Sequence, residues 1–165
     1  MPLRRVYSRI AVDAAESHIL TRVLALWQQK KGDRRFPGRE ELSPRDLVTA
    51  LPHITLCQVL EGGADFQLRI VGEDVREAYG HHLKGRTLTS LGEEIGPTML
   101  EAYRSVVRSG APILMRGWFE HDRHQIFQRE VLIMPLGGTA VDHILAVGIL
   151  LPAAVEYVAG EEVAA

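Results

Sequence analysis

The hydrophobic residues between Asp13 and Gly32 recur every three or four positions and mark one broad helical face. They are Ile19, Leu20, Val23, Leu24, Leu26 and Trp27. Asp13 with Glu16 three positions later resembles a capping box, and Gly32 after two lysines is typical of a helix end. The pattern predicts an amphipathic helix whose apolar face covers either the domain's own sheet or a second subunit.

A second helix is predicted to begin at Ser43-Pro44-Arg45-Asp46, which combines a capping side chain, a proline in the first turn and an acid in the capping-box position. Leu47, Val48 and Leu51 supply its expected buried side, and Pro52 ends it.

After residue 53 the spacing becomes that of strands. Residues 54–60 and 66–71 read as two strands of a hairpin, because a short glycine-rich loop joins them. The acidic pair Glu73-Asp74 then starts a short helix that ends at Gly80. A longer helix is predicted from Pro97 to Gly110.

Three further strands are predicted at residues 111–120, 126–136 and 141–151, and their short connections indicate an antiparallel meander. The expected fold class is α+β, with a five-stranded antiparallel sheet, short helices on one face and N-terminal helices. The chain divides into a loose or short extended arm (1–12), an N-terminal helical segment (13–52), a core (53–151) and a tail (152–165).

This order of elements resembles the PAS domain fold. In common PAS domains the second strand leads into a short helix ending in a Gly-Tyr or Tyr-Gly pair, followed by a hydrophobic residue, a glycine and another hydrophobic residue. The matching positions here are Ile70-Val71, Tyr79-Gly80, Leu83, Gly85 and Leu88. Gly72 stands where an asparagine is often found, which is a departure from the best-studied sensory members.

The chain is also similar to a family of stand-alone bacterial PAS proteins, and the most particular motifs lie in its N-terminal half. The resemblance covers about residues 16–151. The motifs that carry it are Trp27, Gly32, Pro37, Arg39, Ser43-Pro44, Leu51-Pro52-His53, Arg69 with Gly72, and Met134-Pro135-Leu136. The resemblance implies regulation and signalling, and it carries over no known reaction and no ligand set.

Composition and charge narrow the class of protein. The 165 residues are 46% hydrophobic and 24% charged, close to the globular average, so a folded domain is expected. The formal net charge of −2 does not favour a nucleic-acid partner. No segment approaches the roughly 20 apolar residues of a membrane span, and no signal peptide is evident, so we expect a cytoplasmic protein. Cys57, the single cysteine, lies in an apolar run and is expected to be buried.

Small molecules in this fold are expected between the 97–109 helix and the sheet. The candidate lining residues are Leu68, Ile70, Tyr79, Met99, Tyr103, Met115 and Phe119. They would form either a pocket for a small hydrophobic ligand or a filled core. The candidate dimerisation and coupling residues lie on the first helix: Ile19, Leu20, Val23, Leu24 and Trp27.

Other candidate groups have weaker support. His81-His82 follow the short helix, near the place where some haem-binding PAS domains have an axial ligand, and an adjacent pair does not easily face one metal. His121-x-x-His124 occupies a hairpin tip and would need more ligands to hold zinc. We therefore expect no cofactor and no metal. Glu130 is expected in a cross-strand ion pair with Arg69 or Arg116, and no partner for acid–base catalysis is evident.

The leading hypothesis is a single-domain regulatory protein, not an enzyme. It would act through a homodimer and other signalling proteins, with a small ligand as the gate. The alternatives are an enzyme or carrier for a hydrophobic metabolite, and a purely structural dimerisation module.

Overall fold

The computed structural model describes residues 5–80, 82–94, 96–121 and 125–151. They form one six-stranded sheet in the order β1-β4-β5-β6-β2-β3, in which every neighbouring pair is antiparallel. The strands are β1 (Arg5–Ile10), β2 (Ile54–Leu60), β3 (Asp65–Val71), β4 (Ile113–His121), β5 (Gln125–Gly137) and β6 (Val141–Leu150). The predicted α+β class and the antiparallel sheet are confirmed.

The sheet has six strands, one more than the five predicted. Arg5–Ile10, expected as part of a loose or short extended arm, pairs as edge strand β1 with β4 along its whole length. Its six residues include two arginines and a serine, so they do not show the alternation of apolar and polar residues by which a strand is recognised in a sequence. Pairing with a distant strand, rather than local preference, therefore determines this element.

The α-helices are α1 (His18–Lys31), α2 (Glu73–Tyr79) and α3 (Pro97–Ser109). The shorter 3₁₀ helices are η1 (Arg39–Glu41), η2 (Leu51–His53), η3 (Glu61–Gly63) and η4 (Thr89–Glu94). Gly80 and Gly110 end α2 and α3 as predicted. Helix α1 begins later than Asp13, because Ser17 is its N-cap.

The helix predicted after Ser43 is wrong in form, although its capping box is present. Asp46 N–H donates to Ser43 Oγ over 3.2 Å, and Ser43 N–H donates to Asp46 Oδ2 over 3.4 Å. Only a run of turns follows before η2. The segment between Pro44 and Pro52 is too short to gain much from helix propagation, and Val48 is 64% exposed, where burial was expected.

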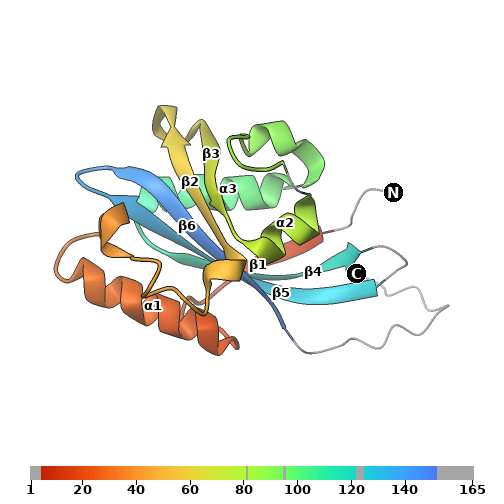
Figure 1. The fold of residues 1–165 in the computed structure, drawn as a ribbon, viewed down its shortest axis with the longest axis horizontal. Helices are drawn as coiled ribbons and strands as arrows, with labels where there is room; N and C mark the ends of the chain where they lie inside the picture. The colour runs from red at the N-terminus through yellow and green to blue at the C-terminus, as the bar shows by residue number, and fades with distance from the viewer. Residues whose placement is uncertain (1–4, 81, 95, 122–124, 152–165) are drawn as a thin grey trace.

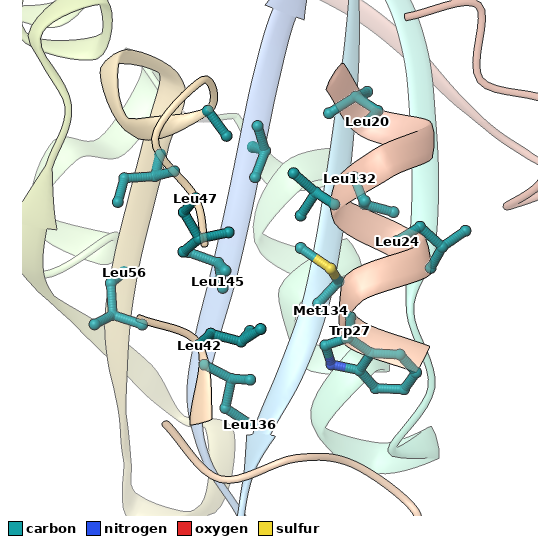
Figure 2. Packing of buried hydrophobic residues seen from close by; sticks show 14 of the residues in the cluster. Leu20, Leu24, Trp27, Leu42, Leu47, Leu56, Leu132, Met134, Leu136 and Leu145 are labelled. Carbon is teal, nitrogen blue, oxygen red and sulfur yellow. The ribbon is translucent and has the colours of Figure 1, made fainter. Parts of the chain in front are cut away.

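The sheet separates two hydrophobic clusters. Helix α1 and the segment after it pack on one face, which we call the α1 face, while α2, η4 and α3 cover the opposite face, which we call the α3 face (Figure 1). Figure 2 shows Leu20 and Trp27 of α1 beside Leu132 and Met134 of β5, and Leu24 belongs to the same cluster. The short helices thus lie on one face of the sheet, as predicted.

Helix α1 is attached to the sheet at both ends. At its start, the carboxylate of Glu130, which is fully buried, accepts hydrogen bonds from the backbone N–H groups of Glu16 and Ser17 over 2.8 and 3.1 Å. Near its end, the Trp27 indole N–H donates to the Pro135 carbonyl over 2.9 Å. These contacts fix α1 on the chain's own sheet.

Candidate functional site

A cavity of about 50 Å³ lies on the α3 face, between the sheet and the helices that cover it. Its apolar wall comes from both layers and includes Leu68, Val75, Leu83, Met99, Val131 and Ala146. Its polar wall comprises His53, Thr55, Tyr79, Tyr103 and Arg129. A space of this size holds a few water molecules and is smaller than the roughly 300–1,000 Å³ of drug-sized ligand pockets.

The structure brings together four of the seven side chains predicted to line a pocket. Leu68, Tyr79, Met99 and Tyr103 border the cavity. Met115 belongs to the same buried cluster without bordering the cavity, and the side chain of Phe119 lies outside the described residues.

Ile70 lies on the α1 face instead, and its predicted place in the pocket is wrong. The register between β2 and β3 pairs Leu56 with Ile70 but Cys57 with Leu68, so Arg69 is an extra residue on β3. Such a bulge reverses the alternation of faces beyond it. Ile70 consequently borders a different cavity and is 45% exposed.

Arg129 is the most chemically distinctive group of the wall, and sequence reasoning did not select it. Its Nη1 donates to the Tyr79 hydroxyl over 2.9 Å, and it also hydrogen-bonds Tyr7 of β1. The guanidinium carbon lies 5.8 Å from the centre of the Tyr79 ring. A helix and an edge strand thus converge on one cation.

Two glycines of the sheet make room for this group. Gly117 pairs with both Tyr7 and Arg129 across the sheet, and a Cβ there would come within 2.7 Å of the Tyr7 ring. A Cβ on Gly148 would come within 2.2 Å of the Arg129 guanidinium. The missing side chains allow Tyr7 and Arg129 to lie flat across their neighbouring strands, and this signal in the sequence was overlooked.

The electrostatics of the wall keep Arg129 charged and the nearby hydroxyl of Tyr103 neutral. Burial lowers the pKa of Arg129, but the neighbouring Tyr79 and Tyr7 oppose this, and the result is a raised pKa. Burial raises the pKa of Tyr103 well above its ordinary value. No carboxylate among the described side chains forms an ion pair with Arg129.

The histidine candidates are not assembled into a metal site within the described ranges. His82 is exposed, whereas His81 and His124 lie outside the described residues. His53, at the cavity wall, pairs with Asp74 over 2.9 Å. No cluster of three or more potential metal-ligating side chains occurs in the part of the chain that the structure describes.

Cys57 is fully buried, as expected. Burial and then the nearby Asp65 raise the pKa of its thiol to about 12. The thiol is therefore protonated and inert at neutral pH.

A second, larger cavity of about 550 Å³ lies on the α1 face, between residues 39–51 and the strands β2, β3, β5 and β6. Leu42, Leu47, Leu56, Leu136 and Leu145 border it, and Figure 2 shows them around the space beside α1. Arg39 and Glu40 also border it, so it offers no single sign of charge.

The five candidate coupling residues of α1 are not displayed to solvent. Leu20, Val23, Leu24 and Trp27 are buried against the chain's own sheet, and Ile19 is partly buried beside them. The sequence left open whether this helix covers the chain's own sheet or a second subunit, and in the structure it covers the chain's own sheet.

Glu130 also lies on the α1 face. Arg116 donates to its Oε1 over 2.7 Å, which confirms the predicted cross-strand ion pair, whereas Arg69 is exposed on β3 and takes no part in it. Glu130 therefore cannot act as an acid or base in the cavity on the other face.

An antiparallel sheet with short helices over one face and a small cavity beneath them is the arrangement expected of a PAS-like α+β domain. Residues 15–151 match the PAS domain family, and the chain belongs to that family. No curated protein sequence matches the chain. None of the described helices has the length and apolar character required to cross a membrane.

Two solved structures match the chain at low sequence identity. An RNA-binding light-oxygen-voltage receptor matches with a TM-score of 0.50 and 16% identity over 89% of this chain, which spans 38% of that protein. A sensory box sensor histidine kinase from Vibrio cholerae matches with a TM-score of 0.44 and 13% identity, covering 68% of this chain and 93% of that one. At 16% identity, the similarity to the receptor concerns the fold alone.

Proposed function

We propose that this protein is a cytoplasmic regulatory PAS protein that acts by binding itself or another signalling protein, with a small ligand in the α3-face cavity as the gate. The observation that carries the proposal is the cavity wall, where Arg129 and Tyr79 meet between a helix and the sheet. A few convergent polar groups in a largely apolar wall are typical of small-molecule sites. The proposal assigns the protein no catalysed reaction.

The ligand would act by favouring one arrangement of the elements around the cavity. The cavity is small in this arrangement, so a ligand larger than a few atoms requires α2 or α3 to move outward. Binding shifts the balance between two arrangements only as far as the ligand prefers one of them. Tyr79 on α2 and Met99 on α3 border the cavity and would report that movement.

The partner surface we favour is the part of the α1 face that α1 leaves uncovered. Val6 and Trp118 pair across β1 and β4, and they are 55% and 37% exposed. Exposed apolar neighbours of this kind are common at protein–protein interfaces. Tyr7, the residue after Val6, reaches Arg129 from the opposite face of the same edge strand, which couples this surface to the cavity.

Sedimentation velocity with and without ligand tests the proposal. We expect a concentration-dependent dimer that Trp118→Ser dissociates, and a ligand-dependent change in the dimer fraction. Val48→Ser is the matched control, because it removes another exposed apolar side chain that lies on neither β1 nor β4. An unchanged mass in Trp118→Ser, together with no ligand-dependent change in any library compound, would contradict the proposal.

A further inference from the structure

The hydrogen-bond partners of Arg129 are tyrosine hydroxyls, whereas four other arginines contact carboxylates. Arg34, Arg76, Arg108 and Arg116 each contact a carboxylate. Arg129 is partly buried in a cavity wall, and its partners among the described residues are the hydroxyls of two tyrosines. Its positive charge is therefore stabilised by neutral dipoles alone.

Removing a cation from water is costly unless an anion or several hydrogen bonds compensate. A guanidinium carries five N–H donors in one plane, and the hydrogen bonds to Tyr79 and Tyr7 use two of them. The guanidinium itself fills the space above Gly148, and no described group accepts a hydrogen bond from its remaining donors. The arrangement has both the charge and the free donors that a planar anion requires.

The remaining wall limits the size and polarity of that anion. Val131 and Met99 border the same space, and the cavity of about 50 Å³ has room only for a short chain. A ligand with a charged head and a small apolar body matches this combination of surfaces.

We propose that the cavity binds a short aliphatic monocarboxylate, with its carboxylate on Arg129 and its hydrocarbon against Val131 and Met99. The inference rests on the proposed ligand-gated function and names the chemical class of the ligand. The Tyr79 hydroxyl positions the guanidinium and lies beside the same carboxylate.

Titration calorimetry, with NMR chemical shifts to locate the site, tests the class of ligand. The probes are acetate, propionate, butyrate and isobutyrate, compared with the neutral isosteres propionamide and butyramide and with inorganic phosphate, all at constant ionic strength. We expect the carboxylates alone to bind. Arg129→Gln should weaken that binding about 10- to 100-fold, as expected for a lost charged hydrogen-bonding partner. Arg69→Gln, which removes an exposed arginine from β3, is the matched control and should leave affinity unchanged.

Tyr79→Phe provides a second test if Arg129→Gln fails to fold, because it removes one oxygen and keeps the ring. We expect it to weaken butyrate several-fold. Equal binding of amides and acids, binding of phosphate alone, or unchanged affinity in Tyr79→Phe and in a folded Arg129→Gln would each overturn the carboxylate assignment. If a neutral compound binds and alters the dimer fraction, the proposed regulatory function stands and only the ligand class is wrong. If no compound of either kind binds, ligand gating itself is refuted.

Discussion

Replacing Glu130 by alanine tests whether the buried ion pair holds α1 on the sheet. The carboxylate accepts hydrogen bonds from Arg116 and from two backbone N–H groups ahead of α1. Arg116 also donates to the Ala14 carbonyl over 2.9 Å. The substitution therefore leaves two amide donors without their acceptor, and it leaves the Arg116 guanidinium with only the exposed carboxylate of Glu16, 3.8 Å away.

The expected cost follows from burial. Breaking a buried ion pair from one side typically costs about 3–5 kcal/mol, whereas an exposed pair contributes about 0.2–1 kcal/mol. Glu130 is fully buried, so we expect a loss near the first range. A domain of this kind has about 5–15 kcal/mol of stability in total, and the variant should therefore still fold.

Urea denaturation followed by tryptophan fluorescence and by far-ultraviolet circular dichroism measures this loss. With an m-value near 2 kcal/mol/M, the midpoint should fall by about 1.5–2.5 M. Glu101→Ala is the matched control, because Glu101 pairs with Arg108 on the surface, where the side chains are 61% and 62% exposed. Its midpoint should move by less than about 0.5 M.

A double-mutant cycle with Arg116→Ala separates the ion pair from the backbone contacts. We expect a coupling energy above about 1 kcal/mol, with the double variant more stable than the sum of the two single losses implies. Coinciding midpoints for Glu130→Ala and Glu101→Ala, or a coupling energy near zero, would refute the reasoning.

Three further predictions concern other buried groups. Trp27→Phe should lower the free energy of unfolding by about 2–4 kcal/mol in urea denaturation, because it removes the hydrogen bond to Pro135 and leaves a cavity. The Cys57 thiol has a pKa of about 12 when folded and ionises near pH 9 when unfolded. Its contribution to the free energy of unfolding should therefore fall between those pH values by at most about 1.4 kcal/mol per pH unit, and Cys57→Ala should reduce the measured slope by that amount. Gly72→Ala should lower the melting temperature measured by calorimetry, because its Cβ would lie 2.4 Å from the Pro52 carbonyl oxygen, and an unchanged value would contradict this close approach.

Local patterns carried most of the fold prediction. Five strands, α2 and α3 follow from apolar spacing and from caps such as Gly80 and Gly110, because these signals act between residues close in sequence. Three of the seven predicted lining residues depended on equally local signals: Leu68 lies on an alternating strand, and Met99 and Tyr103 lie on one face of α3. A prediction from the alternation of side chains between the two faces of a strand fails beyond a bulge, and Ile70 lies beyond the bulge in β3.

The charged wall of the cavity could not be predicted in the same way. Arg129 stands in an apolar strand, and its role depends on Tyr7, Tyr79 and two glycines that come from four separate elements. No spacing along the chain relates these positions. Their meeting is a consequence of sheet register and of the docking of α2.

The sequence by itself determined the strands β2 to β6 and the helices α1, α2 and α3, since apolar period and capping chemistry are properties of neighbouring residues. The tertiary structure alone decided that residues 5–10 join the sheet, that α1 covers the chain's own α1 face, and that Arg129 lies beside Tyr79. Each of these depends on contacts between residues about 50 to 110 positions apart, as Arg129 with Tyr79 and Trp27 with Pro135 illustrate. Such contacts form only when the whole sheet is assembled, because their free energy comes from burial and pairing across strands rather than from any local preference.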